Sequence, residues 1–143
     1  MFAILKRLVG RPGKREDGQS LVEFALVVPI FLLVLFAIVD FGMAFHAWIT
    51  VTNSAREGAR YGAVRATSPE IVQRVRDTAE SLDQANLTVS VTNAEGQPGE
   101  SVVVDVSYDY SLMTPLADLL NMVSGGTIPA TLGLSSTADM RLE

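Results

Sequence analysis

The residues most suited to chemistry meet at one junction, 18–24 (GQSLVEF), between a basic segment and a long apolar stretch. A basic leader, a glycine at Gly18 and an acid five residues later together predict a proteolytic processing site. Glu23 is the only charged residue in the apolar stretch 21–39 (LVEFALVVPIFLLVLFAIV). A carboxylate costs roughly 2 kcal/mol or more near the centre of a bilayer, and less near its boundary. We therefore expect Glu23 to need a partner for its charge.

Two arrangements would satisfy Glu23. If the chain is cut after Gly18, the new amine at Gln19 lies four residues before Glu23, and helix residues at that spacing are neighbours. The amine of the same chain, or that of the next subunit in an assembly, could then neutralise the carboxylate. In the other arrangement, Glu23 lies at the membrane boundary and its side chain reaches water.

The apolar stretch predicts a single transmembrane helix at about residues 21–40, because about 20 apolar residues cross the hydrocarbon core. A buried helix of a soluble protein is the alternative, but the rest of a 143-residue chain is too short to wrap it completely. An ordinary signal peptide cut near Ala44–Ala47 is a second alternative. The polar and aromatic residues nearby argue against that cleavage, and the stretch exceeds a signal h-region of about 7–15 residues.

The charges predict which side of the membrane each part occupies. Residues 1–18 contain five basic and two acidic residues, a net charge of +3, which leaves −8 for residues 19–143 from the total of −5. Because basic segments stay in the cytoplasm, we expect a cytoplasmic N-terminus and an exported C-terminal part. The acidic balance also makes nucleic acid an unsuitable partner.

The helical pattern continues past the apolar stretch, so we expect one helix from about Gln19 to Val64, roughly 70 Å long. Pro29 predicts a kink, because it lacks an N–H and leaves the carbonyl of Ala25 unpaired. Asp40 marks the membrane interface, and Gly42 is a second position at which the helix could bend. We expect the outer half to project as a stalk whose small residues allow another helix to approach closely. These residues are Ala55, Gly58, Ala59, Gly62 and Ala63.

The remaining residues, 66–143, predict a small α+β head. Thr67-Ser68-Pro69-Glu70 is a helix start, followed by an apolar face of Ile71, Val75, Thr78, Ala79 and Leu82. Residues 87–92 and 102–110 alternate between apolar and polar residues, which predicts two strands joined by the turn cluster 93–99. Residues 112–122 allow one or two helical turns, and 132–136 allow a third strand. The expected fold is a long N-terminal helix with a short helix laid on an antiparallel sheet.

The other polar groups do not predict catalysis. The chain has one histidine, His46, and no cysteine, so neither a thiolate metal site nor a catalytic triad can be assembled from them. Asp105 and Asp109 share a strand face with Ser107, and a solvated face explains them better than cation binding. We therefore expect no enzymatic activity, no cofactor, no metal and no small-molecule substrate.

Residues 18–65 (GQSLVEFALVVPIFLLVLFAIVDFGMAFHAWITVTNSAREGARYGAVR) strongly resemble the TadE-like family, minor pilins (pseudopilins) of the tight-adherence, or Flp, type IV pilus system. The ending 136–141 (STADMR) is also similar to the family's C-terminal pattern. The resemblance implies that Gly18 is the last leader residue and is cut by a prepilin peptidase. It implies that Glu23 serves processing or assembly, with Phe24 the aromatic residue beside it. It also makes 40–42 (DFG) and 55–60 (AREGAR) juxtamembrane signatures.

The resemblance further implies a structural component of a thin pilus used in adhesion or biofilm formation. The expected domains are a cleaved cytoplasmic leader (1–18), a long helix (19–65) and an exported head (66–143). The expected location is the inner (cytoplasmic) membrane as a single-pass protein, with the extracellular pilus as a further location. Partners would be the peptidase, other pilin subunits, the inner-membrane assembly platform and the lipid bilayer. A permanently anchored adaptor that never enters a fibre is the alternative, and its small-residue stripe would serve a fixed helix dimer.

Overall fold

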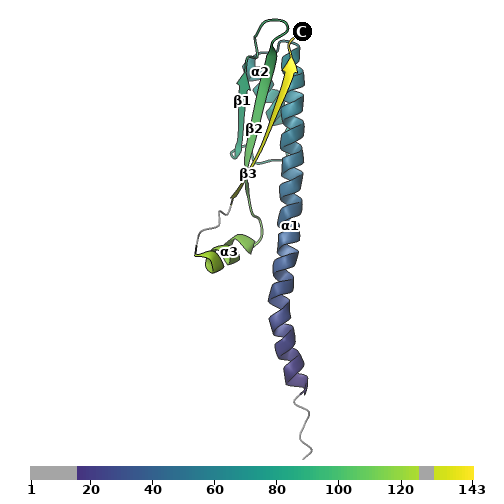
Figure 1. Ribbon diagram of the computed structural model, residues 1–143, viewed down its shortest axis with the longest axis vertical. Coiled ribbons are helices and arrows are strands. Elements are labelled where there is room, and N and C mark those ends of the chain that lie inside the picture. Colours follow the sequence, from purple (N-terminus) through teal and green to yellow (C-terminus); the bar gives the residue numbers. More distant parts are fainter. Residues whose placement is uncertain (1–15, 126–130) are drawn as a thin grey trace, which may run out of the picture. The chain divides into compact units, whose positions relative to one another are not determined.

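A computed structural model describes residues 16–125 and 131–143 of the chain (Figure 1). Three helices and three strands follow one another as α1 (Glu16–Ala63), α2 (Ser68–Thr78), β1 (Leu87–Thr92), β2 (Ser101–Ser111), α3 (Leu116–Ser124) and β3 (Thr131–Arg141). The predicted α+β class, with a long N-terminal helix and an antiparallel sheet, is confirmed. Most of the predicted leader, residues 1–15, and residues 126–130 after α3 lie outside the described residues.

The chain forms two compact units, and α1 contributes to both. In the unit that ends at Leu35, the apolar side chains of α1 are largely exposed, including Leu21, Phe24 and Phe31. In the unit that begins at Phe36, α1 buries one small or medium residue on nearly every turn. These residues are Ala44, Ala47, Val51, Ala55 and Ala59. The second part of α1 is therefore a core element of the head.

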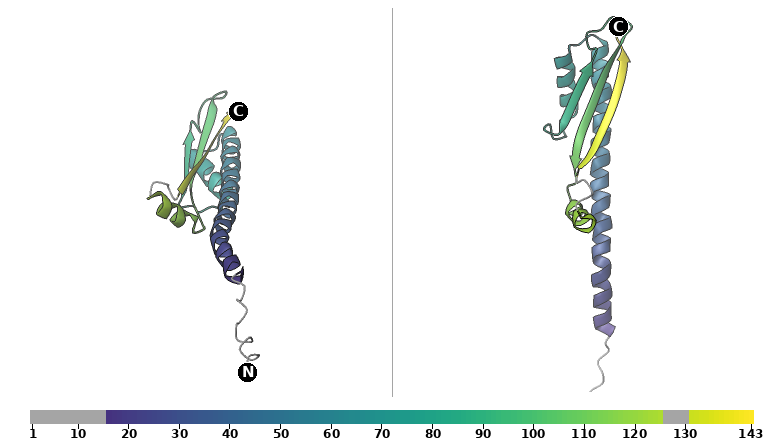
Figure 2. Two further views of the ribbon diagram at one scale, coloured as in Figure 1. Left: turned by 60° about the horizontal axis from the view of Figure 1, so that its bottom comes forward. Right: turned by 60° about the vertical axis from the view of Figure 1, so that its left-hand side comes forward.

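The sheet has the strand order β1-β2-β3, and both pairs are antiparallel (Figure 2). The hairpin β1–β2 pairs Leu87 with Tyr108 and Thr92 with Val103, which confirms the predicted pair of strands around the turn at 93–99. The third strand is also confirmed, and it is longer than the sequence suggested because it pairs with β2 over its whole length. β2 is thus the central strand, hydrogen-bonded on both sides.

The head core lies between one face of the sheet and the helices α1 and α2. Side chains alternate along β2, so that one face is buried and the other faces solvent, as period-two patterning requires. The buried face carries Val102, Val104, Val106, Tyr108 and Tyr110. α2 adds Ile71 and Val75, which are fully buried. Ala79 and Leu82 are buried just beyond it, but Thr78, predicted on the same face, is exposed and donates its hydroxyl to the Arg74 carbonyl.

The start of α2 follows the predicted capping signal. The Glu70 carboxylate accepts hydrogen bonds from the backbone N–H of Thr67 at 2.8 Å and from the Thr67 hydroxyl at 2.7 Å. These two bonds, with the hydroxyl the larger influence, lower the pKa of Glu70 below its ordinary value. Pro69 occupies the first turn, where its missing N–H costs nothing. The turn between α1 and α2 is therefore fixed by its own side chains.

The residues after β3 return to the end of α1. Leu142 is buried and donates its N–H to the carbonyl of Glu100 at 2.8 Å. Glu143 donates its N–H to the carbonyl of Ala63 at 3.1 Å and accepts a hydrogen bond from the Arg65 side chain at 3.0 Å. A carbonyl at the end of α1 that has no partner within the helix is thereby satisfied. The head is closed by contacts between residues far apart in the sequence.

Candidate processing and assembly site

The predicted processing junction lies in the first turns of α1. Gly18 is exposed, and a Cβ added there would meet no atom within 4 Å. The side-chain amide of Gln19 donates a hydrogen bond to the Glu23 carboxylate at 3.1 Å. Phe24 is 67% exposed. Gly18 and Phe24 are thus exposed to solvent, and the Glu23 carboxylate already accepts a hydrogen bond from the residue one turn earlier.

The Gln19–Glu23 contact bears on the predicted charge pair. It shows that a donor on residue 19 reaches the Glu23 carboxylate within an unbroken helix. The pair expected after cleavage uses the main-chain amine of Gln19 instead of its amide, and that pair stays a prediction. A charged donor would strengthen the contact, since charge-assisted hydrogen bonds are roughly twice as strong as neutral ones.

One helix among the described residues, Gly18–Ala63, is long and apolar enough to cross a membrane. Its most apolar window is not buried by any other part of the described chain. An unburied apolar surface of this size requires lipid or apolar protein around it. The helix continues through Pro29, which removes one hydrogen bond from its ladder.

Asp40 has a role that the sequence did not reveal. Its side chain is only 1% exposed, and its Oδ1 accepts the backbone N–H of Met113 at 2.9 Å and that of Thr114 at 3.2 Å. The Thr114 hydroxyl donates to the other carboxylate oxygen. The carboxylate therefore ties the segment between β2 and α3 to α1. The predicted place at the membrane interface stays a prediction, but the side chain faces the head.

Tyr110 lies near this carboxylate and is 5% exposed. Its hydroxyl has no hydrogen-bond partner within the described part of the chain. Burial is the main cause that raises the pKa of Tyr110, and the negative charge of Asp40 adds to it. The tyrosine therefore stays neutral at physiological pH and serves the core as an apolar ring.

The small residues of α1 pack within the chain, which corrects the expected stalk. Ala55 and Ala59 are fully buried, and a Cβ at Gly58 would lie 2.4 Å from Val75 Cγ2 of α2. A Cβ at Gly62 would lie 3.0 Å from atoms of α2 and β2. The close approach that the pattern predicted is made by the head of the same chain. The helix that approaches is α2 of the same chain. The fully buried Ala55 and Ala59 therefore offer no surface to a stalk contact or to the fixed helix dimer of the alternative. Ala63 is half-buried at the helix end, and Gly42 is exposed.

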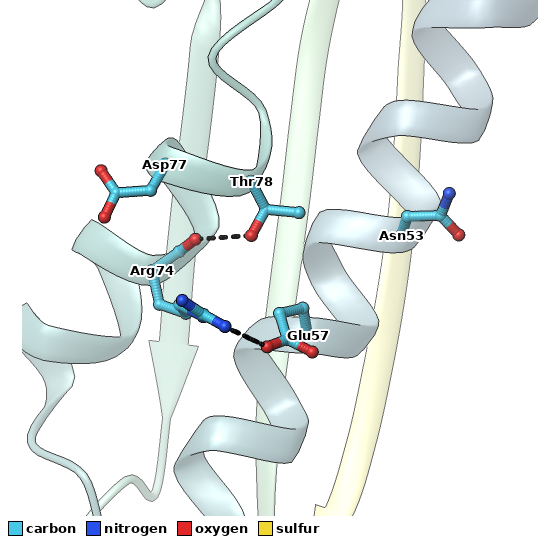
Figure 3. A pocket seen from close by; sticks show the side chains of 5 residues that line it. All are labelled: Asn53, Glu57, Arg74, Asp77 and Thr78. Carbon is cyan, nitrogen blue, oxygen red and sulfur yellow. Dashed lines mark hydrogen bonds and ion pairs between the residues drawn. The ribbon is translucent and has the colours of Figure 1, made fainter.

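A second polar contact locks α2 onto α1. Arg74 of α2 donates to the Glu57 carboxylate of α1 at 2.7 Å (Figure 3). Arg60, one turn along α1, donates to the same carboxylate at 2.8 Å. The hydrogen bond from Arg60, followed by that from Arg74, lowers the pKa of Glu57 to about 2. The nearby hollow of about 370 Å³ is also lined by Asn53 and Asp77, whose side chains point away from the pair. This arrangement fastens the two helices to each other.

The remaining candidates are on the surface. His46 is exposed, and so are Asp105 and Asp109 on the outer face of β2. Asp105 accepts a hydrogen bond from the Thr137 hydroxyl of β3, which makes it a cross-strand partner. Within residues 16–125 and 131–143, no group of three histidine, cysteine or acidic side chains could hold a metal ion. The arrangement of polar side chains is one that holds a fold together.

The comparisons with known proteins agree with the N-terminal features. The model of the family described as TadE-like protein matches residues 18–60, from the predicted processing glycine to three residues before the end of α1. No curated protein and no solved structure matches the chain. The matched segment contains Gly18, Glu23, Asp40 and Glu57, which are the polar and processing features described above. Over this N-terminal segment, which is less than half of the chain, the sequence is similar to the TadE-like family.

Proposed function

We propose that the chain is a minor pilin of a tight-adherence (Flp) type IV pilus, cleaved after Gly18 by a prepilin peptidase and then assembled through α1. The observation that carries the proposal is the TadE-like match, which begins at the proposed cleavage residue and covers the whole apolar stretch. Similarity to that family over the N-terminal segment supports pilus proteins as partners. Adhesion and biofilm formation would be the cellular result of the assembled fibre.

The exposure of α1 supports an assembly role. The head covers α1 only from about residue 40 onward, so the apolar surface before it is available to lipid first and to other subunits later. In lipid, the Glu23 carboxylate is costly, and pairing with the Gln19 amine of a neighbouring subunit would relieve that cost in a fibre. Cleavage creates this amine, and thus cleavage would prepare the helix for assembly.

The proposed topology follows the charges. The basic leader would stay in the cytoplasm with the peptidase, and the acidic head would be exported. We also propose that the chain has no catalytic activity of its own. The described polar side chains of the head serve mainly as caps, cross-strand contacts and helix locks.

The deciding experiment is the intact mass of the protein from its native membrane, compared with that of Gly18→Ala. The expected result is a chain that begins at Gln19 in the wild type and at Met1 in the variant. Gly42→Ala is the matched control, because it makes the same change in the same helix away from the junction. A wild-type chain that still begins at Met1 would favour a permanently anchored adaptor and refute the minor pilin.

Incorporation into the fibre is tested separately by shearing. Sheared pili should contain the mature wild-type chain, and Glu23→Gln should be cleaved yet lost from the sheared fraction. A chain that is cleaved at Gly18 but is never found in sheared pili would act at the base of the machine.

A further inference from the structure

The helix α3 presents apolar side chains that the head does not bury. In α2, Ile71 and Val75 are fully buried, whereas α3 has no fully buried residue among the side chains that are described. Leu116, Leu119 and Leu120 are only half-buried, and Met122 is 76% exposed. A helix that keeps apolar side chains uncovered on one face can lay them in a membrane interface.

The position of α3 is set by Asp40. Because the Asp40 carboxylate accepts the N–H groups of Met113 and Thr114, the segment that leads into α3 lies beside residue 40 of α1. The views in Figures 1 and 2 show α3 beyond the end of the sheet, away from the β1–β2 turn. Residue 40 is also where the apolar stretch 21–39 ends. The helix is therefore held at the level where α1 would leave the membrane.

The surface of α1 at this level is apolar as well. Ile38 is 64% exposed, Phe41 is 70% exposed and Phe45 is 50% exposed. Phe45 and Trp48 contact each other with ring centroids 5.5 Å apart. The side chains of Phe41, Ala44, Phe45, Trp48, Leu132 and Leu134 line an apolar hollow of about 330 Å³. Tryptophan and other aromatic residues gather where a helix leaves the hydrocarbon core.

The surface around α3 carries few charged side chains. α3 carries a single charged residue, Asp118, and no basic residue in its last turn. Asp40, the acid on the adjoining turn of α1, is used within the chain. Attraction to anionic lipid headgroups needs lysine or arginine, which this surface lacks. Burial of apolar side chains is therefore the force available for binding.

We propose that α3, together with Met113 before it, lies in the interfacial layer of the membrane that α1 crosses, with its uncovered apolar side chains in contact with lipid. The partner is the bilayer itself, since this surface continues the apolar stretch of α1. The inference rests on the proposed membrane anchoring and goes beyond it, because it gives the head its own lipid contact. The head would then have to leave this layer when the subunit moves into a fibre.

The test uses spin labels on the full chain in phosphatidylcholine–phosphatidylglycerol vesicles. The chain has no cysteine, so each label can be attached at a single introduced one. Met122→Cys reports on α3, Gln73→Cys reports on the exposed surface of α2, and Leu26→Cys reports on the span. Collisions with oxygen, which enters lipid, are compared with collisions with a water-soluble nickel complex.

The expected oxygen-to-nickel collision ratio is several-fold higher at residue 122 than at residue 73, and highest at residue 26. A ratio at residue 122 equal to that at residue 73 would overturn the lipid contact while leaving the anchor in place. Shielding of residue 122 from both reagents, with spin–spin broadening, would assign the surface to a second copy and also overturn it. A water-exposed label at residue 26 would remove the anchoring on which the inference rests.

Discussion

The packing of α1 against the head gives a quantitative prediction at Gly58. A Cβ at this position would lie 2.4 Å from Val75 Cγ2 and 3.2 Å from Val104 Cγ1, whereas carbon atoms pack at about 3.5–4.0 Å. Overpacking of this kind costs about 1–3 kcal/mol. Replacing a helical glycine by alanine stabilises the folded state by about 0.5–1 kcal/mol, because alanine loses less conformational entropy on folding. The difference is about 0–2.5 kcal/mol. Because an approach of 2.4 Å is shorter than real Cβ contacts, we expect Gly58→Ala to lower the free energy of unfolding of the head by about 1–2 kcal/mol, in the upper part of this range.

The assay is hydrogen exchange of the full chain in detergent micelles, read on peptides from β2 and α2. A loss of this size should speed exchange through global opening by about 5–30-fold. Gly42→Ala is the control, since a Cβ there meets no atom within 4 Å, and exchange in that variant should be slower or unchanged. Equal protection in Gly58→Ala and the wild type would refute the direct contact between α1, α2 and β2.

Three further predictions follow from the polar contacts. Glu57→Gln should lower the free energy of unfolding by about 1 kcal/mol at neutral pH. The fall in the pKa of Glu57 to about 2 sets an upper limit of about 3 kcal/mol for the contribution of this carboxylate. Solvent screens the contacts because both arginines are exposed, so the expected effect is smaller than this limit. This contribution is present above the ordinary pKa of 4.5 and is lost as the pH falls toward 2, so acid titration of unfolding should show the wild type converging on the variant. Asp40→Asn replaces one acceptor oxygen by a donor, and should speed exchange of the amides of Met113 and Thr114 by about tenfold or more, with β1 unaffected. Thr67→Ala removes the hydroxyl that donates to Glu70 and should lower the midpoint temperature of thermal unfolding, measured by calorimetry.

The sequence predicted the features that depend on neighbouring residues. The capping signal at Thr67 and Glu70 acts over three residues, and alternating valines along β2 define a buried face by period alone. The apolar stretch of α1 was equally plain, since its length and composition suffice. These features need no knowledge of which distant segments meet.

The features that sequence reasoning missed join segments far apart. The donors to Asp40 lie at residues 113 and 114, more than 70 positions away, and an aspartate after an apolar stretch reads as an interfacial residue. The stripe around Ala55 and Gly58 correctly predicted a close approach, but spacing cannot say whether the approaching atoms belong to the same chain. Glu57 and Arg74 lie 17 positions apart, and nothing in the sequence around either residue indicates that their side chains meet.

The two parts of α1 differ in what covers them, and this difference bears on the proposed assembly role. After Asp40 the helix is committed to its own head, because Val51, Ala55 and Ala59 have no exposed surface left for a partner. Before Phe36 the helix has no cover among the described residues, so its surroundings must come from outside the chain. Lipid and a bundle of apolar helices are equally suitable apolar surroundings for the aliphatic side chains. They differ for Glu23, whose carboxylate is costly in lipid and is relieved beside a neighbour's amine. If the proposed function is correct, Glu23 alone would thus make contact with other subunits more favourable for this apolar helix than the bilayer.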